Sequence, residues 1–337
     1  MGTIGKKTLA MQALSWDNNK HVGELSDVKS QTSIKRLAVN LAGLRLANPT
    51  MLASGILGYT AHSLLRMERA GAAAVTTKSI GVKPRVGYPN PTVVNLDCGI
   101  LNAMGLPNPG IDVFAQEIRE SKSLLHVPLV VSVYGFSEQE YAAVVEKAVE
   151  AGADAVELNV SCPHVKETGS EIGQNPQVLS KVVKAVKAKA NKPVFVKLSP
   201  NVTSIVEMAE AAAKAGANGL TVANAVRAMA IDVETATPIL GNRVGGLSGT
   251  AIRPVAVRCV YDVYENVGLP MIGCGGISSW EDAVEFILAG ASAVQIGSGV
   301  AKRGINVFRH VTQGIDAYLQ KKGFRSMKEI VGMSHRK

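Results

Sequence analysis

Short apolar runs alternate with longer amphipathic stretches along most of the chain. The apolar runs have the length and composition of strands, and between them apolar residues recur with helical spacing. The expected strands lie near 50–54, 73–79, 128–134, 155–161, 193–199, 218–224, 269–274 and 292–297. The expected helices lie at about 61–70, 111–124, 137–151, 176–190, 203–215, 251–267, 280–289 and 306–321. Strands that alternate with helices predict a parallel sheet, and eight such units predict an α/β fold, the closed (β/α)8 TIM barrel. A doubly wound open sheet is the alternative.

A short repeat marks four of the expected helix ends. Ala-Gly-Ala stands at 70–72, 151–153, 215–217 and 289–291, each time just before an apolar run. The central glycine suits the left-handed backbone position that closes many helices, and the small alanines allow the helix end to pack closely on the sheet. The repeat therefore supports helix-to-strand junctions at these places.

A change in the sequence pattern near residue 36 marks the start of the barrel domain. Residues 1–36 are polar, mixed in charge and weakly periodic, which predicts an N-terminal arm that is poorly ordered or loosely docked. Residues 37–337 are expected to form a single barrel domain. At its start, two apolar runs flank Ala42 and Gly43 and predict a hairpin.

Charge and hydropathy exclude several classes of protein. The net charge of +9 comes from the ends of the chain, because residues 1–36 carry +3 and residues 301–337 carry +7, which leaves −1 for the body. This distribution argues against nucleic-acid binding. No apolar run reaches the roughly 18 residues that span a bilayer, and the start lacks a continuous apolar segment. We therefore expect a cytoplasmic protein that does not bind membranes.

The four cysteines, Cys98, Cys162, Cys259 and Cys274, do not stand at the spacing of a zinc or iron–sulfur site. We expect neither a metal site nor a disulfide framework. Cys162 is distinctive because it follows the strand 155–161 directly and precedes Pro163, which ends the strand. A thiol at the carboxyl end of a barrel strand suits acid–base chemistry at mild pH. A plain buried thiol is the alternative.

Glycine-rich turns follow the seventh and eighth expected strands. Gly275 and Gly276 stand after the seventh strand, and Gly297 and Ser298 stand after the eighth. Free backbone N–H groups at these two places form the phosphate site of many barrel enzymes, although glycine also allows a merely tight turn. No G-x-G-x-x-G motif opens a strand–helix unit, so a mononucleotide is favoured over a dinucleotide.

Polar side chains close several other strands. Lys78 and Lys197 each end an apolar run, and two lysines on one rim would balance negative charge on a ligand, such as a reduced flavin anion; a lysine that only reaches for water is the alternative. Asn102, Asn159 and Asn224 offer amide donors and acceptors that suit a cyclic ureide such as a pyrimidine, although an asparagine also caps loops. Two long connections, at 80–110 and 225–250, leave the same rim and are expected to bind or cover a ligand.

Together these motifs resemble the class 1 dihydroorotate dehydrogenases, and class 1B most of all. The segments that carry the resemblance are 53–55, 78–79, 101–110, 159–163, 197–200, 228–234, 245–249, 275–276 and 297. The resemblance implies bound FMN and oxidation of dihydroorotate to orotate in pyrimidine biosynthesis. Cys162 would remove the C5 proton, while a hydride leaves C6 for flavin N5.

The resemblance also implies the residues that contact each ligand. Those expected at FMN are Ser54, Lys78, Ser79, Ser132, Asn159, Lys197, Ala223, Gly249, Gly275, Gly276, Gly297 and Ser298. Those expected at the substrate are Lys78, Asn102, Ala103, Met104, Gly105, Leu106, Asn159, Asn224 and Ala225. Class 1B enzymes also imply a homodimer core and an electron-transfer subunit with FAD and a [2Fe–2S] cluster, which passes electrons to NAD⁺.

Three positions depart from the family pattern. His164 stands where the family usually has asparagine, Ala225 replaces threonine or serine, and Ser132 replaces asparagine. The Cys-Pro-His sequence also resembles the pyrimidine-reducing domain of dihydropyrimidine dehydrogenases, which would reduce uracil or thymine. A tRNA-dihydrouridine synthase is a further alternative, although too few residues follow the barrel for an RNA-binding domain. A non-redox phosphate-binding barrel would leave both lysines and Cys162 without a joint role.

Overall fold

Eight parallel strands close into a barrel in the computed structural model, which describes residues 35–161 and 172–336. The strand order around the barrel is β3-β4-β7-β8-β9-β10-β15-β16. These strands are β3 (Thr50–Leu52), β4 (Ala74–Thr76), β7 (Leu129–Val133), β8 (Ala155–Asn159), β9 (Val194–Leu198), β10 (Gly219–Val222), β15 (Met271–Cys274) and β16 (Ala293–Ile296). The predicted TIM barrel is confirmed, and each expected strand has its counterpart.

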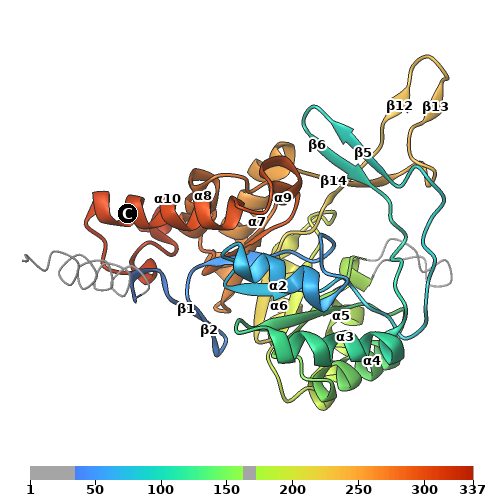
Figure 1. Cartoon of the computed structure of the whole chain (residues 1–337), viewed down its shortest axis with the longest axis horizontal. Helices are drawn as coiled ribbons and strands as arrows, with labels where there is room; N and C mark the ends of the chain where they lie inside the picture. Colours follow the sequence, from blue (N-terminus) through green and yellow to red (C-terminus); the bar gives the residue numbers. More distant parts are fainter. Residues whose placement is uncertain (1–34, 162–171, 337) are drawn as a thin grey trace, which may run out of the picture.

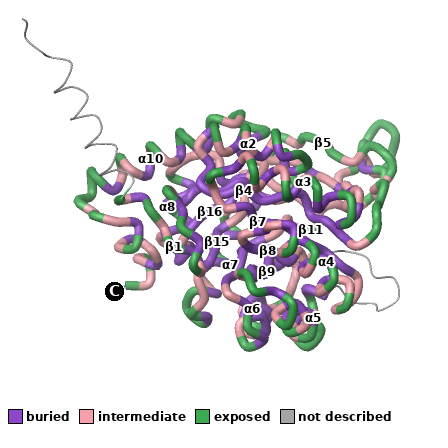
Figure 2. The backbone as a smooth tube through the Cα atoms, turned by 60° about the horizontal axis from the view of Figure 1, so that its bottom comes forward, coloured by how far each residue is buried: buried purple, intermediate pink, exposed green. Residues whose placement is uncertain are grey.

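Helices surround the barrel, as Figure 1 shows. They are α2 (Ala61–Arg69), α3 (Ile111–Leu124), α4 (Glu138–Glu150), α5 (Pro176–Lys189), α6 (Ile205–Lys214), α7 (Arg253–Asn266), α8 (Trp280–Leu288), α9 (Ser298–Arg303) and α10 (Val307–Lys322). Short 3-10 turns are η1 (Ile172–Gln174), η2 (Thr250–Ile252), η3 (Met327–Glu329) and η4 (Met333–His335). Each long helix buries one apolar side, so the strands lie in a buried centre (Figure 2). Among the described residues, none of these helices is both long enough and apolar enough to cross a membrane.

The Ala-Gly-Ala repeat closes four helices in one way. Gly71, Gly152, Gly216 and Gly290 have φ values from 97° to 126°, the left-handed region that glycine adopts at no steric cost. At each end the glycine N–H donates to the carbonyl three residues back, and the next N–H donates to the carbonyl five residues back. This is the Schellman arrangement, so the repeat has the predicted role.

The amino end of the barrel is plugged by the predicted hairpin. Strands β1 (Val39–Leu41) and β2 (Leu44–Leu46) pair antiparallel across a two-residue turn in which Ala42 and Gly43 both have positive φ. Three leucines of the hairpin pack with Met51, Phe195 and Ile272 in one buried cluster. Because apolar side chains fill this end among the described residues, a ligand site is expected at the carboxyl end of the barrel.

The two long connections contain strands that the sequence analysis did not predict. Strands β5 (Val93–Leu96) and β6 (Gly99–Asn102) come from the first connection, and β11 (Val226–Ala228) and β14 (Gly245–Ser248) come from the second. They form one antiparallel sheet in the order β11-β14-β6-β5. A further hairpin, β12 (Ile231–Asp232) and β13 (Thr237–Pro238), projects from the body of the molecule (Figure 1).

These strands were missed because they are short and partly exposed, so they lack a buried apolar run. Helix α9 was missed for a similar reason. It spans six residues between Gly297 and Gly304, too few for a helical period to be detected in the sequence.

Candidate active site on the barrel rim

Most of the predicted site residues lie at or near the carboxyl ends of the barrel strands. Ser54 follows β3, Lys78 and Ser79 follow β4, and Asn159 ends β8. Cys162 and His164 lie outside the described residues, so their placement stays a prediction. Ser161, the last described residue before them, donates its backbone N–H to Oδ1 of Asn159 at 3.4 Å.

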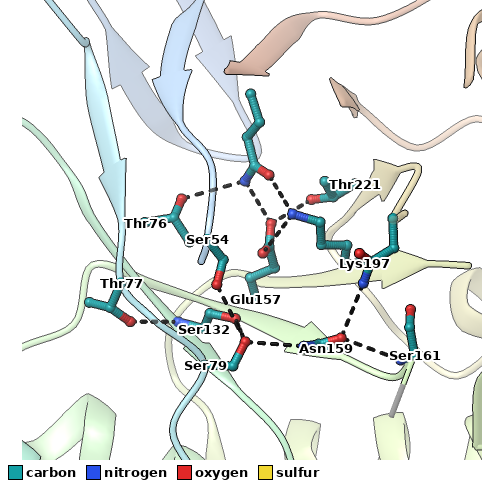
Figure 3. Close-up of polar contacts among 12 residues, drawn as sticks. Ser54, Thr76, Thr77, Ser79, Ser132, Glu157, Asn159, Ser161, Lys197 and Thr221 are labelled. Carbon is teal, nitrogen blue, oxygen red and sulfur yellow. Dashed lines mark hydrogen bonds and ion pairs between the residues drawn. The ribbon is translucent and has the colours of Figure 1, made fainter. Parts of the chain in front are cut away.

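A chain of hydroxyl and amide groups joins neighbouring strands across the rim (Figure 3). The Ser79 hydroxyl is its centre, 3.3 Å from the Ser54 hydroxyl and 2.9 Å from the Ser132 hydroxyl. It also accepts a hydrogen bond from Nδ2 of Asn159 at 3.1 Å. Ser79 and Ser132 are buried, so their hydroxyls are held by each other rather than by water. The substitution of the family's asparagine by Ser132 is therefore accommodated within this chain.

The same chain continues to the sixth strand. Nδ2 of Asn224 donates to Oδ1 of Asn159 at 3.3 Å, and Oδ1 of Asn224 accepts the backbone N–H of Ala225 at 2.8 Å. Asn201, which was not predicted, donates to the Ala225 carbonyl at 3.0 Å. The orientation of the Asn159 and Asn224 amides is thus fixed by their partners. Ala223 is buried just before this pair, and its peptide bond with Val222 is cis.

The segment from Asn102 to Leu106 is brought to this edge by the sheet of the long connections. Nδ2 of Asn102 donates to the carbonyl of Gly246 at 3.2 Å. This bond joins the two long connections, and it lies beside Asn224, because a Cβ atom on Gly246 would lie 2.8 Å from the Cβ of Ala225. Of the other residues in the segment, Ala103 is buried, and Met104, Gly105 and Leu106 are half-buried.

A single asparagine anchors the far end of that segment. Nδ2 of Asn108 donates to the Tyr134 hydroxyl at 2.7 Å and to the Leu106 carbonyl at 3.0 Å, while its Oδ1 accepts the N–H groups of Gly81 and Gly110. Asn108 is 6% exposed, so its amide is held by these three backbone groups and by the Tyr134 hydroxyl. The sequence analysis did not single it out.

The glycine turns line a cavity of about 300 Å³. Its wall includes Gly249, Thr250, Gly276, Ser278, Ser298 and Gly299. The backbones approach closely here, because a Cβ on Gly276 would lie 2.5 Å from the Gly249 carbonyl oxygen and a Cβ on Gly299 would lie 2.3 Å from the Ile277 carbonyl oxygen. Only glycine fits these contacts. The result is a concave surface of main-chain groups, of the kind that holds a phosphate.

The two predicted lysines are both buried but differ in their surroundings. Lys78 is 7% exposed, and its ammonium group makes no hydrogen bond or ion pair with another described residue. Burial lowers its pKa from the ordinary value of 10.5. Nζ of Lys197 instead donates to Oε1 of Gln295 at 2.9 Å and lies 3.5 Å from Oε1 of Glu157.

A polar layer beneath the rim was missed by the sequence analysis. Glu157, Gln295, Thr221 and Thr76 are each at most 1% exposed and are joined by hydrogen bonds inside the barrel (Figure 3). The available signal was a charged residue in the middle of the apolar run 155–161. A glutamate that points into a barrel cannot be told from one that points outward without the strand register.

The site can therefore bind a polar ring and a phosphate at once. Its amides and hydroxyls offer donors and acceptors, its buried lysines offer positive charge, and its glycine turns offer a phosphate-sized hollow. Within residues 35–161 and 172–336 no cluster of three or more His, Cys, Asp or Glu side chains is arranged to hold a metal ion.

Comparison with known proteins gives a consistent picture. The family model described as dihydroorotate dehydrogenase matches residues 36–319. A Pyrococcus abyssi protein named dihydroorotate dehydrogenase B (NAD(+)), catalytic subunit, is 51% identical over 298 residues, which are 88% of this chain and 99% of that protein. Proteins of the same name are 50% identical in Methanosarcina acetivorans (88% of this chain, 95% of that protein) and in Methanocaldococcus jannaschii (89% and 98%).

The fold has a solved counterpart. The crystal structure of DHODH from Eimeria tenella in complex with ferulenol matches with a TM-score of 0.77 and 24% identity, over 95% of this chain and 96% of that chain. At that identity the similarity concerns the fold.

Proposed function

The chain belongs to the dihydroorotate dehydrogenase family, and from this premise we propose that it oxidises dihydroorotate to orotate in pyrimidine biosynthesis. FMN is the proposed flavin. The substrate would lose a proton from C5 and a hydride from C6, and a double bond would form between these two carbons. Bound FMN would supply the two-electron acceptor for that hydride.

The observation that carries the proposal is the ammonium group of the buried residue Lys78, which has no partner among residues 35–161 and 172–336. An isolated buried charge is costly, and among the described residues nothing balances this one. Dihydroorotate carries a carboxylate and a reduced flavin is anionic, so either ligand would supply the missing negative charge. Uracil and thymine carry no carboxylate. Lys78 therefore supports an anionic ligand at this rim, and the names of the relatives favour the orotate substrate over the dihydropyrimidine dehydrogenase alternative.

The residues of the rim fit FMN at both of its ends. Gly249, Gly275, Gly276, Gly297 and Ser298 would hold the phosphate, since the turns that contain them pack so closely that side chains are excluded at Gly249 and Gly276. The residues that would contact the ring system are Ser54, Lys78, Ser79, Ser132, Asn159, Lys197 and Ala223. Most of them already share the hydrogen-bonded chain centred on the Ser79 hydroxyl.

The substrate would lie over the ring, between the asparagines of the rim. Asn159 and Asn224 would donate to and accept from the ring amides, and their orientations are fixed by the bond between them. The remaining contacts would come from Lys78, Asn102, Ala103, Met104, Gly105, Leu106 and Ala225. Cys162 would remove the C5 proton as general base, and the strand that precedes it ends at Asn159.

The names of the relatives also support a partner. They are catalytic subunits of NAD(+)-linked enzymes, and we propose that this chain works with an electron-transfer subunit that carries FAD and a [2Fe–2S] cluster. Two copies of the chain would form the core of that complex. The isolated chain is then expected to reduce artificial acceptors but not NAD⁺, and sedimentation should give a dimer. Efficient NAD⁺ reduction without any second protein would contradict the partner.

Anaerobic titration of the purified, FMN-loaded chain tests the reaction. Dihydroorotate should bleach the flavin absorbance, and orotate should perturb it. Cys162→Ser should slow bleaching by about 10²–10⁴-fold, as expected for loss of a general base. The matched control is Cys98→Ser, because Cys98 is exposed. A response to uracil or thymine with none to orotate would instead support the dihydropyrimidine dehydrogenase alternative, and a protein that binds no flavin would remove the redox proposal altogether.

A further inference from the structure

One carboxylate lies in the interior of the barrel, beneath the site. Glu157 stands in the middle of β8, two residues before Asn159, so both side chains point to the same side of the strand. Its side chain is fully buried. A buried carboxylate is costly unless charges and hydrogen bonds compensate it, so its partners show what it does.

The partners of Glu157 hold it in one orientation. Its Oε2 accepts hydrogen bonds from Nε2 of Gln295 at 2.6 Å and from the Thr221 hydroxyl at 2.9 Å. Its Oε1 accepts no hydrogen bond from any described residue. That oxygen lies 3.5 Å from Nζ of Lys197 (Figure 3). One edge of the carboxylate is therefore saturated, and the other faces the ammonium group.

Gln295 connects the same two groups a second time. Its amide nitrogen donates to Glu157, and its amide oxygen accepts from Nζ of Lys197 at 2.9 Å. The two contacts demand opposite ends of the amide, so they fix its orientation. Lys197 is thus held from below by an ion pair and a hydrogen bond. Because an ammonium group has three protons and Lys197 makes its one hydrogen bond among the described residues to Gln295, at least one donor remains for a ligand above.

The charge of Lys197 depends on this arrangement. Burial alone lowers its pKa, whereas attraction to Cys274 and Glu157 and the polar contact with Glu157 raise it, and the net pKa lies above the ordinary 10.5. These are the titratable groups that face it among the described residues. Burial also raises the pKa of the Cys274 thiol, so that thiol is neutral at physiological pH. Glu157 is then the group that keeps Lys197 charged.

The other rim lysine is a natural contrast. Lys78 is also buried but has no carboxylate partner among the described residues, and its pKa is lowered rather than raised. The pKa values of the two lysines are therefore shifted in opposite directions for a structural reason. One has a built-in counter-charge, and the other requires a ligand.

We infer that Glu157 is a positioning residue for Lys197: held by Gln295 and Thr221, its carboxylate fixes the place and the positive charge of that ammonium group beneath the flavin. This inference rests on the proposed function in one respect, because that proposal places Lys197 at the flavin. The ion pair itself does not depend on the ligand.

The first test is a lysine titration by NMR on the full-length chain with ¹³C-labelled lysine. Lys197→Arg identifies the Lys197 signal by its loss. Glu157→Gln, which keeps the shape and removes the charge, should lower the Lys197 titration midpoint by about one to three pH units. Glu157→Asp, which keeps the charge, should restore most of the midpoint. Equal midpoints in the wild type and Glu157→Gln, or equal shifts in both variants, would overturn the inference.

The second test measures the midpoint potential of bound FMN. At mildly alkaline pH the potential should be lower in Glu157→Gln than in Glu157→Asp, because a neutral Lys197 no longer stabilises the reduced, anionic flavin. Equal potentials would overturn the role toward the flavin. If the wild type binds no FMN, the proposed function fails while the NMR titration still tests the ion pair. If Glu157→Gln does not fold, the Lys197 titration of the wild type tests the inference by itself. A Lys197 midpoint below that of ordinary lysines would contradict the inference.

Discussion

Asn159 and Ser79 are 80 positions apart in the chain, yet Nδ2 of Asn159 donates to the Ser79 hydroxyl over 3.1 Å. The bond joins the ends of two barrel strands that are not neighbours, since β7 lies between β4 and β8. It also fixes which end of the Asn159 amide faces Asn224. A substitution at Ser79 should therefore alter the position of Asn224, although Asn224 is not itself hydrogen-bonded to Ser79.

Ser79→Ala should weaken both folding and ligand binding. It leaves the buried Ser132 hydroxyl and the Asn159 amide without their shared partner, which costs about 1–3 kcal/mol of unfolding free energy. Affinity for FMN should fall about tenfold if roughly 1.4 kcal/mol of this is lost from the site. Denaturant unfolding and fluorescence titration measure the two effects. Ser123→Ala is the control, because Ser123 is exposed and bonds only to the Glu120 carbonyl in its own helix. Identical behaviour of the two variants would argue against the chain of hydroxyls.

Gly276→Ala should reduce FMN binding by about tenfold or more, because alanine at φ 75° is strained by about 1–3 kcal/mol. The new Cβ would also lie 2.5 Å from the Gly249 carbonyl oxygen, which forms part of the same cavity wall. Comparing FMN with riboflavin isolates the phosphate: the variant should lose affinity for FMN and change little toward riboflavin. Gly268→Ala is the matched control, since nothing lies within 4 Å of its added Cβ. Full FMN affinity in Gly276→Ala would refute the phosphate cradle.

Lys78→Met should stabilise the ligand-free protein and damage the site. Because burial lowers the pKa of Lys78 below 10.5, the unfolded chain binds more protons than the folded chain between the lowered pKa and 10.5. Stability from this group therefore rises with pH across that window, and its full cost is present below the lowered pKa. The variant should gain about 1–3 kcal/mol near neutral pH, and the gain should vanish as the pH approaches 10.5.

The same variant should bind orotate at least about thirtyfold more weakly, as expected for about 2 kcal/mol of lost charge pairing. Unfolding at several pH values and equilibrium binding of orotate measure the two effects. Lys184→Met, on the exposed side of α5, should change neither. A destabilised Lys78→Met protein at neutral pH would show that the ammonium group has a partner.

Leu41→Ala should separate stability from function. Leu41 is fully buried in the hairpin that plugs the amino end of the barrel, so truncation should cost about 2–5 kcal/mol. FMN affinity should stay unchanged in the folded protein, because the site lies at the opposite end. Leu57→Ala, at a leucine that is 44% exposed, should cost far less. A large loss of FMN affinity in folded Leu41→Ala would mean that the plug also shapes the rim.

Local signals were enough to predict most of the barrel. The central glycine of each Ala-Gly-Ala repeat can adopt the left-handed backbone conformation that closes a helix, and all four adopt it. A strand that is buried on both sides is a continuous apolar run in the sequence. Each barrel strand was therefore located within a few residues of its observed ends. Because the carboxyl ends of parallel barrel strands lie at the same end of the barrel, the residues that follow the strands could be assigned to one rim.

Other features depend on contacts between distant segments. Strands β6 and β14 pair across more than a hundred residues, for example Leu101 with Leu247, and neither is apolar enough to be detected alone. The partner of Glu157 could not be predicted because Lys197, Gln295 and Thr221 converge only after the barrel closes. The rim serines likewise needed the register of β4 and β7. Cys162 was singled out by its place after a strand and by the resemblance, and its role stays a prediction because it lies outside the described residues.

The shared sheet β11-β14-β6-β5 has a consequence for engineering. Asn102 belongs to the connection after β4, and Asn224 and Ala225 begin the connection after β10. The sheet pairs the two connections with each other through β6 and β14. A chimera in which one connection is replaced by that of a related barrel would contain only the strands of that connection. Those strands would not match the pairing register of the connection that was kept. Segments 80–110 and 225–250 should therefore be exchanged together, as a single graft, when this scaffold is redirected to another ring.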